Sequence, residues 1–419
     1  MNRIETRLTR TAVMVAALAL FVTVPARAAD PAGGMPGEWL SQYAGARALG
    51  MGGAYVATAD DALGILWNPS GLSRLDQNQL MFENLQLFED TSVNGFSVAV
   101  PGSWLPSFGL SMVSLSSGNF QRTNDVNDPL GAFKEGETAY FFTMSKNLGP
   151  RFSIGTNLKL VQQTIEDFSG GGFGFDLGAM YQISPQLRFG ISALNLGGPS
   201  ITLRQTAETY PTEYRGGVAL AALNGRALIT AEIDQSTGLG TRFHTGAEYW
   251  IQSGIAARVG YDDSRATGGF SYRFLPQYQF DYGVADHPLG MTHRFGLTYR
   301  FGGFFAASQA DPQVFSPTGE KAVTKIDLNA RTKSGAESWT LELHDKSNVV
   351  VRKFGGAGQP PAHLLWDGKD ESGMPMADGT YRYQLTVKDK EGRVLIGPLR
   401  QIEIFTNGPQ GSVPVLPVQ

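Results

Sequence analysis

The stretch THRFGLTYRFGG, residues 292–303, places an apolar or aromatic side chain at every second position: Phe295, Leu297, Tyr299 and Phe301. Arginine, glycine and threonine occupy the positions between them. A period of two predicts a β-strand, because successive side chains of a strand point to opposite faces. The two faces of this strand therefore need two different surroundings, one apolar and one that accepts arginine.

The same alternation recurs through the middle of the chain, and it predicts about fourteen strands. The face opposite the apolar one is rich in glycine, which weakens a solvated strand but leaves room inside a barrel. Short turns alternate with longer loops, which is typical of barrels that cross an outer membrane. The predicted strands start near residues 79, 92, 106, 136, 152, 171, 186, 212, 226, 241, 254, 268, 277 and 292.

We therefore expect an all-β fold in which residues 78–302 form a ~14-stranded antiparallel transmembrane β-barrel. Closing the sheet leaves no unpaired edge in lipid, and the arginine face points into the lumen. An arginine such as Arg294 or Arg300 placed at mid-depth on the lipid side would cost roughly 2–4 kcal/mol. An even number of strands returns the chain to the periplasmic side, where a C-terminal soluble domain fits.

The composition excludes several classes of protein. Charged residues make up 17% of the chain, and the net charge of −4 gives no reason to expect nucleic acid as a partner. The chain has no cysteine, so disulfides and thiolate metal sites are impossible.

The N-terminus predicts export. Basic residues at Arg3, Arg7 and Arg10 precede the apolar run of residues 11–24, and Ala26 and Ala28 fit a small-x-small cleavage site. This pattern is typical of a signal peptide, here residues 1–28, and the run is short for an anchor helix, which needs about 20 residues.

Beyond the barrel, residues 303–319 are predicted to be a linker. Residues 320–407 contain six or seven short strands separated by polar turns, which predicts an Ig-like β-sandwich. Residues 408–419 are a proline-rich tail. Asp367 and Asp378 are interpreted as turn residues of the sandwich, with a calcium site as the alternative.

Residues 29–77 lack the dyad pattern and precede the barrel, so they are expected to sit in its lumen as a hatch. Their glycines do not have the spacing of a phosphate-binding loop. Asp60 and Asp61 fit a helix N-terminus or a salt bridge better than a catalytic pair. The candidate residues for the hatch and for a ligand path are Gly52, Gly53, Asp60, Asp61, Asn68 and Pro69.

Two stretches resemble known families. GARALGMGGAYVATADDALGILWNPSGLSRL, residues 45–75, is similar to the start of the PorV/PorQ group of FadL-like (FadL/TodX) outer-membrane proteins, with Ser70 in place of the usual alanine. This resemblance implies a fourteen-stranded barrel with a hatch. WDGKDESGMPMADGTYRYQLTV, residues 366–387, resembles the Ig-like domain of the flagellar hook-cap family and implies only a domain type.

The chemistry visible in the sequence favours a non-enzyme. No two histidines have metal-ligand spacing, no nucleophile motif is present, and no cofactor is expected. The polar residues expected to face the lumen are of mixed sign, which predicts ion pairs that brace the wall; the alternatives are a clamp on the hatch or a ligand site. These residues are Asp176, Arg188, Glu232, His244, Glu248, Arg258, Arg273, Asp281 and Arg294.

The resemblance to FadL-like proteins implies two alternative functions. The first is passive passage of hydrophobic small molecules, such as fatty acids, across the outer membrane. The second is a PorV-like role in protein secretion or surface attachment, with residues 320–407 in the periplasm as a docking module for a protein partner. Outer-membrane lipid is the expected surrounding in both cases, and a purely structural barrel is a third reading.

Overall fold

The computed structural model describes residues 36–37, 39–40, 45–88, 90–238, 240–252, 254–287, 289–318 and 322–406. The predicted signal peptide and the C-terminal tail lie outside the described residues. Among those described, no helix is long and apolar enough to cross a bilayer.

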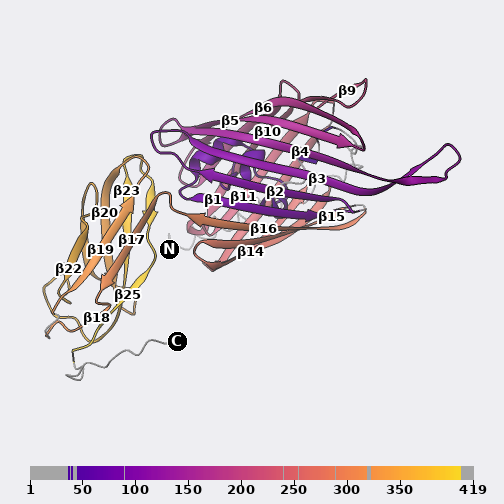
Figure 1. The fold of residues 1–419 in the computed structure, drawn as a ribbon. Coiled ribbons are helices and arrows are strands. Elements are labelled where there is room, and N and C mark those ends of the chain that lie inside the picture. Colours follow the sequence, from indigo (N-terminus) through magenta and orange to yellow (C-terminus); the bar gives the residue numbers. More distant parts are fainter. Residues whose placement is uncertain are drawn as a thin grey trace, which may run out of the picture.

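Fourteen antiparallel strands close into a barrel, because β1 pairs with β16 (Figure 1). The predicted fold class is confirmed. The strands of the barrel are β1 (Asn78–Gln86), β2 (Ser92–Val100), β3 (Ser107–Thr123), β4 (Pro129–Asn147), β5 (Phe152–Ile165), β6 (Phe168–Gln182), β7 (Leu187–Leu196), β10 (Glu213–Ala222), β11 (Ala227–Ser236), β12 (Thr241–Gln252), β13 (Ile255–Asp262), β14 (Arg265–Leu275), β15 (Tyr278–His287) and β16 (Gly290–Phe301).

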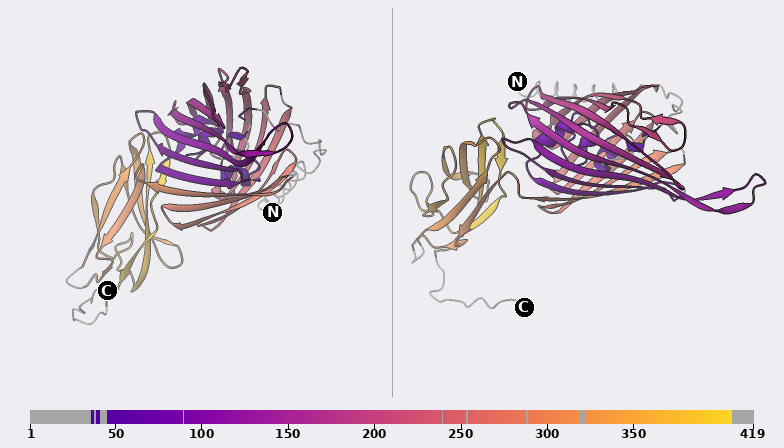
Figure 2. Two further views of the ribbon diagram at one scale, coloured as in Figure 1. Left: turned by 45° about the vertical axis from the view of Figure 1, so that its right-hand side comes forward. Right: turned by 45° about the horizontal axis from the view of Figure 1, so that its top comes forward.

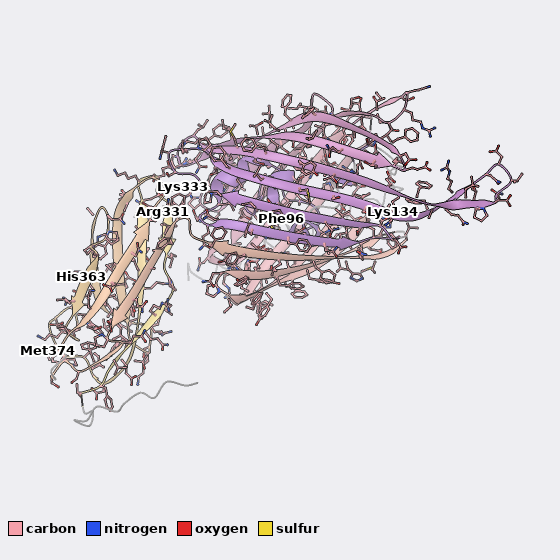
Figure 3. The ribbon with its side chains drawn as sticks, in the orientation of Figure 1. Phe96, Lys134, Arg331, Lys333, His363 and Met374 are labelled. Atoms are coloured by element: carbon pink, nitrogen blue, oxygen red, sulfur yellow. The ribbon has the colours of Figure 1, made fainter. Side chains whose placement is uncertain are left out.

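The strand that opened the sequence analysis is β16, and its two faces meet different surroundings. Phe295 and Leu297 are exposed on the outside, whereas Arg294 on the inner face is fully buried. Phe96 on β2 belongs to the same outer apolar belt (Figure 3). An apolar outer belt on a closed barrel is the surface that a bilayer requires, so the barrel is built to span a membrane.

The segment between residues 116 and 136, which the sequence suggested to be a long loop, is mostly strand. β3 continues to Thr123 and β4 starts at Pro129, so the two form a hairpin that extends beyond the rest of the barrel (Figure 2). The Asn124 side chain closes its tip by accepting the backbone N–H groups of Val126 and Asp128. The tip therefore needs no contact with the barrel wall.

The N-terminal hatch lies inside the barrel (Figure 1). It contains α3 (Ala46–Gly50) and two 3-10 helices, η1 (Gly64–Leu66) and η2 (Pro69–Arg74). The longest of the three has six residues, so the hatch is largely irregular backbone. Irregular backbone at membrane depth is tolerated where it is buried in protein.

Two smaller elements join the barrel strands. The link from β7 to β10 holds the short hairpin β8 (Ser200–Thr202) and β9 (Ala207–Thr209), which folds over β6. The turn from β10 to β11 holds η3 (Leu223–Gly225).

The C-terminal domain is a β-sandwich whose core includes Trp366, Leu341 and Tyr383. One sheet has the order β17-β19-β22 and the other β18-β25-β23-β20-β21, with β24 paired to β23. Its strands are β17 (Phe305–Asp311), β18 (Val314–Phe315), β19 (Thr324–Arg331), β20 (Ala336–His344), β21 (Val350–Ala357), β22 (His363–Trp366), β23 (Gly379–Asp389), β24 (Val394–Ile396) and β25 (Arg400–Ile404).

The prediction of a linker at 303–319 is wrong, because β17 and β18 lie in this range. β17 pairs with β19 along its whole length and buries Ala306, Ser308 and Ala310 against the sandwich. These small side chains give a weak hydrophobic signal, which is why the strand was missed. Only residues 302–304 separate the last barrel strand from the sandwich.

Candidate functional site

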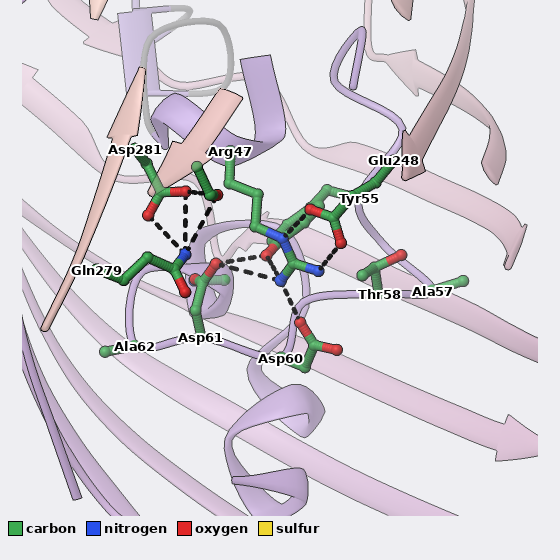
Figure 4. Close-up of polar contacts among 12 residues, drawn as sticks. Arg47, Tyr55, Ala57, Thr58, Asp60, Asp61, Ala62, Glu248, Gln279 and Asp281 are labelled. Carbon is green, nitrogen blue, oxygen red and sulfur yellow. Dashed lines mark hydrogen bonds and ion pairs between the residues drawn. The ribbon is translucent and has the colours of Figure 1, made fainter. Parts of the chain in front are cut away.

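The hatch is held by an arginine that the sequence analysis did not select. Arg47 of α3 donates two hydrogen bonds to the carboxylate of Glu248 on β12, at 2.9 and 3.0 Å (Figure 4). Its third nitrogen donates to Asp60 and, at 2.8 Å, to the Tyr55 hydroxyl. The guanidinium therefore ties two turns of the hatch to the barrel wall, and two-bond arginine–carboxylate pairs also fix orientation.

Asp60 and Asp61 do different things, although they are neighbours. Asp60 is the more exposed of the two, and its carboxylate pairs with Arg47. Asp61 is buried, accepts the Tyr55 hydroxyl, and accepts the Gly64 N–H at 2.7 Å where η1 begins. Both carboxylates hold the hatch together, in line with the salt-bridge and helix-start interpretation.

Side chains of the wall satisfy the irregular backbone of the hatch. Glu232 accepts the N–H groups of both Tyr55 and Val56 at 2.7 Å. Glu83 accepts the Ala46 N–H at 2.9 Å, and Thr267 accepts the Gly52 N–H at 3.0 Å. Since a buried unpaired backbone group costs free energy, these acceptors replace the water that the hatch lost on entering the barrel.

Asn68 and Pro69 start η2. The Asn68 side-chain oxygen accepts the Ser70 N–H, which caps the helix, and Pro69 takes the first helical position. The Asn68 side-chain nitrogen donates to the carbonyl of Val56 in the hatch and to those of Ala179 and Ile191 in the wall, at 2.9, 3.1 and 3.2 Å. Asn68 thus links the hatch to β6 and β7.

Gly52 and Gly53 form a turn of positive φ, +64° and +76°, that glycine adopts without strain. His244 of β12 contacts this turn, with its Nδ1 3.0 Å from the Gly52 carbonyl oxygen. The other ring nitrogen lies 2.9 Å from Asp234. A predicted lumen residue therefore meets a predicted hatch residue, and its role here is to position the turn.

The glycines of the wall provide the space for the hatch. A Cβ added at Gly246 would lie 2.3 Å from the Met51 carbonyl oxygen, and one at Gly260 would lie 2.1 Å from the Gly52 nitrogen. Both distances are too short for any side chain, so hatch backbone runs directly against wall backbone on this side.

The remaining predicted lumen residues divide into two groups. Arg188 and Arg294 donate to hatch carbonyls, those of Ala57, Thr58 and Gly45. The others bond within the wall: Arg258 joins Glu248 to Asp281, Arg273 donates to Gln279, and Asp176 pairs with Lys159. Some of these residues therefore stabilise the barrel wall, and others hold the hatch.

The candidate residues from the sequence did not include Arg47, Glu83 and Arg215, nor Lys159, although alternation places Lys159 on the inward face of its strand. Arg215 forms ion pairs with Glu213 and Glu232. A cation inside the glycine- and alanine-rich stretch 45–54 was the available signal for Arg47. The other three occupy inward positions of predicted strands and could have been found by continuing the alternation.

One part of the lumen holds a cluster of apolar side chains, called here the apolar half-lumen. The inward side chains of β1 to β5 include Met81, Leu85, Val113, Phe141 and Val161, all buried in one hydrophobic cluster. Leu63, Ile65 and Leu72 of the hatch belong to the same cluster. Most of the charged residues predicted for the lumen lie on β10 to β16, while Glu83 of β1, Glu137 of β4 and Lys159 of β5 are charged inward residues among the apolar ones.

The wall is interrupted on the apolar side. β6 and β7 pair with a register shift between Phe175 and Leu177. The last pair is Phe175 with Leu196, where β7 ends. A cavity of about 500 Å³ opens there toward the outside. Its lining includes the outward-facing Leu110, Leu158, Phe173 and Phe175 and the inward-facing Phe141 and Lys159.

The described residues contain no cluster of three or more potential metal ligands. The arrangement as a whole can hold a hatch, present an apolar half-lumen and offer a cavity in the wall.

Family models match the C-terminal domain and the larger part of the barrel. A FlgD Ig-like domain matches residues 315–391, and a family of unknown function, DUF5723, matches residues 135–306 of the barrel. The first match and the two-sheet structure confirm the Ig-like prediction. None of the curated proteins matches the chain.

Several solved barrels are similar in fold. A TodX deltaS2S3 mutant monoaromatic hydrocarbon channel has 12% identity and a TM-score of 0.47, and the match covers 61% of this chain and 98% of that one. The toluene transporter TodX of Pseudomonas putida has 13% identity and a TM-score of 0.46, covering 61% and 96%. A FadL homologue of Pseudomonas aeruginosa has 12% identity and a TM-score of 0.43, covering 61% and 98%. The finer resemblance to PorV/PorQ proteins stays a prediction, as does the secretion role that it implies.

Proposed function

We propose that the protein is an outer-membrane channel through which small hydrophobic molecules pass passively. The observation that carries the proposal is the cavity at the register shift of β6 and β7, because its lining combines exposed apolar side chains with Phe141 of the apolar half-lumen. A volume of about 500 Å³ is in the range of small-molecule sites.

The orientation follows from the turns. The connections at the end of the barrel where the sandwich is attached, such as residues 148–151 and 183–186, are short, whereas the opposite end carries the long link of residues 197–212 and the extended β3–β4 hairpin (Figure 2). Short turns of outer-membrane barrels face the periplasm. We therefore place the sandwich in the periplasm and the β3–β4 hairpin at the cell surface.

The route avoids the ionic side of the hatch. Arg47 and Glu232 fix the hatch to the wall through several buried hydrogen bonds, so its displacement would be costly. The apolar half-lumen and the wall cavity lie on the other side. A hydrophobic molecule would move along this apolar side and leave through the wall, and the hatch would stay in place.

The lining favours a ligand with a large apolar part. The one cation at the inner end of the cavity, Lys159, donates to Asp176 at 2.9 Å and to Asn195 at 2.6 Å. Its charge is balanced within the wall. The proposed substrates are therefore hydrocarbon-like molecules. Fatty acids, the example expected from the sequence, are one such class.

The experiment fills the cavity from its lipid side. Leu158→Trp enlarges a lining side chain, whereas Leu297→Trp makes the same change on β16, away from the cavity. Both variants would be expressed in cells with an intact outer membrane, and uptake of a fluorescent hydrophobic dye would be timed. We expect a several-fold slower uptake with the first variant and unchanged uptake with the second. Equal uptake by both, at equal amounts of heat-modifiable folded barrel, would overturn the proposal.

A further inference from the structure

A polar cavity lies where the barrel meets the sandwich. It encloses about 390 Å³ and is unrelated to the cavity in the wall. The β2–β3 turn, residues 101–106, and the end of β4 form its barrel side. Ser73 at the end of the hatch and Lys333, Ser334 and Glu391 of the sandwich complete it; Figure 3 shows Lys333 at this junction.

Two ammonium groups reach this cavity from opposite sides. Lys146 of β4 donates to the carbonyls of Ser103, at 3.2 Å, and Trp104. Lys333 of the sandwich is buried and donates to the carbonyls of Ser73 and, at 3.2 Å, Leu75. An ammonium has three N–H donors, so each lysine can donate once more. Within the part of the chain that the structure describes, neither lysine has a carboxylate within ion-pair distance.

One carboxylate also lines the cavity. Glu391 is half-buried, and its backbone N–H is held by the Ser334 hydroxyl and by Asp389. Across the described ranges, the Glu391 carboxylate forms no ion pair. The cavity thus offers two cationic donors and one anionic acceptor, which suits a ligand that carries a negative and a positive group.

The rim of the cavity carries exposed apolar side chains. Trp104 is 79% exposed at the tip of the β2–β3 turn, and Leu105 beside it is exposed as well. Both line the cavity and continue the outer apolar belt beyond Val100 and Phe108. Tryptophan is enriched where lipid headgroups meet the acyl region. A molecule in this cavity could therefore keep an apolar tail in the bilayer.

We propose that this cavity binds the headgroup of a zwitterionic phospholipid of the inner leaflet, with its phosphate on Lys146 and Lys333 and its amine on Glu391. The acyl chains lie against Trp104 and Leu105. The inference rests on the orientation given under the proposed function and not on the passage of hydrophobic molecules, so it stands if the transport experiment fails.

The test measures lipid binding to the full-length protein in detergent by native mass spectrometry. Phosphatidylethanolamine and phosphatidylglycerol would be titrated, since the second has a phosphate but no amine. Lys146→Gln is expected to weaken binding of both lipids about tenfold, the order of a lost charge-assisted hydrogen bond. Glu391→Gln is expected to weaken phosphatidylethanolamine alone, by a similar factor. Lys134→Gln on the distant hairpin is the matched control and should change neither (Figure 3).

The lipid-selective loss separates binding from folding. Lys146 also holds the β2–β3 turn, so its variant could act through that turn, but the Glu391 side chain does not hold it. A further arm adds inorganic phosphate or soluble phosphoethanolamine as competitor. If either competitor displaces the lipid only at a concentration far above that of the lipid, the result supports a headgroup site. Equal potency of inorganic phosphate, or an equal loss of both lipids in the Glu391 variant, would overturn the proposal.

Discussion

Arg47 and Glu248, 201 positions apart in the sequence, form a two-bond ion pair between the hatch and the barrel wall. The arginine side chain is 14% exposed and the glutamate side chain 3%, so water screens the pair little. The pair is shared, since Glu248 also accepts from Arg258 at 2.7 Å. The hatch is therefore joined to the same ionic network that braces β12 to β15.

Replacing Arg47 with methionine should loosen the hatch. The change leaves Glu248 short of one partner, and breaking a buried ion pair costs about 3–5 kcal/mol. The free energy of unfolding in denaturant and the rate of protease cleavage within residues 45–76 would report the loss. Arg122→Gln is the control, because the Arg122–Glu166 pair is 56% and 28% exposed and should contribute about 0–1 kcal/mol. Equal effects of both variants would contradict the anchoring role.

Replacing Gly260 with alanine should displace the hatch without preventing strand pairing. The new Cβ would lie 2.1 Å from the Gly52 nitrogen, and overpacking of this kind costs about 1–3 kcal/mol. Gly216→Ala is the matched control on β10, where no atom lies within 4 Å of the added Cβ. Heat-modifiable migration on gels should show folded barrel for both, and only the first should become protease-sensitive in the hatch.

Lys333 should make docking of the sandwich depend on pH. Burial lowers the pKa of the Lys333 ammonium to about 7; Arg393 and Arg74 lower it further, while Asp76 and Glu391 oppose them. The unfolded lysine keeps its proton to about pH 10.4, so the folded form binds fewer protons between these values. The docked state is then least stable below about pH 7 and gains stability as pH rises toward 10.

The measurement is the pH dependence of the thermal unfolding midpoint of the sandwich, from pH 6 to pH 9. The wild-type midpoint should rise over this range relative to that of Lys333→Met, which cannot titrate. Parallel curves for the two proteins would show that another group is responsible.

An arginine in the outer belt should hinder membrane assembly. Phe96→Arg puts a charge among the lipid-facing side chains of β2, at a cost of up to about 2–4 kcal/mol. Val126→Arg makes a comparable change at the tip of the β3–β4 hairpin, where the side chain is 74% exposed and outside the belt. The yield of folded barrel in membranes should fall only for the first variant.

The strands could be predicted because each carries its own signal. Alternation alone placed the starts of β2, β5 and β12 at residues 92, 152 and 241, as the structure has them. β4 and β6 start earlier than predicted. The ends of these strands that lie beyond the apolar belt lack a consistently apolar face, so they show no alternation. The alternation of side chains along a strand is a local property, so it can be recognised in a single sequence.

The site could be predicted only in part, because its contacts join distant segments. Inward positions such as Glu232 and His244 follow from alternation, but their contacts with Tyr55, Val56 and Gly52 depend on how the hatch is threaded. The apolar half-lumen was also missed. Its residues, such as Val113 and Val161, are ordinary strand residues that become informative only when the closed sheet places them together.

The barrel closes between β1 and β16 at the same point where the sandwich is attached. Asp76 lies two residues before β1, and Phe304 lies three residues after β16. The Asp76 backbone carbonyl accepts the Phe304 N–H at 2.6 Å, and the Asp76 carboxylate accepts the Arg393 guanidinium at 2.7 Å. During biogenesis these contacts cannot form until the first and last strands have met. A sandwich that is not docked on Asp76 would therefore indicate a barrel that has not closed.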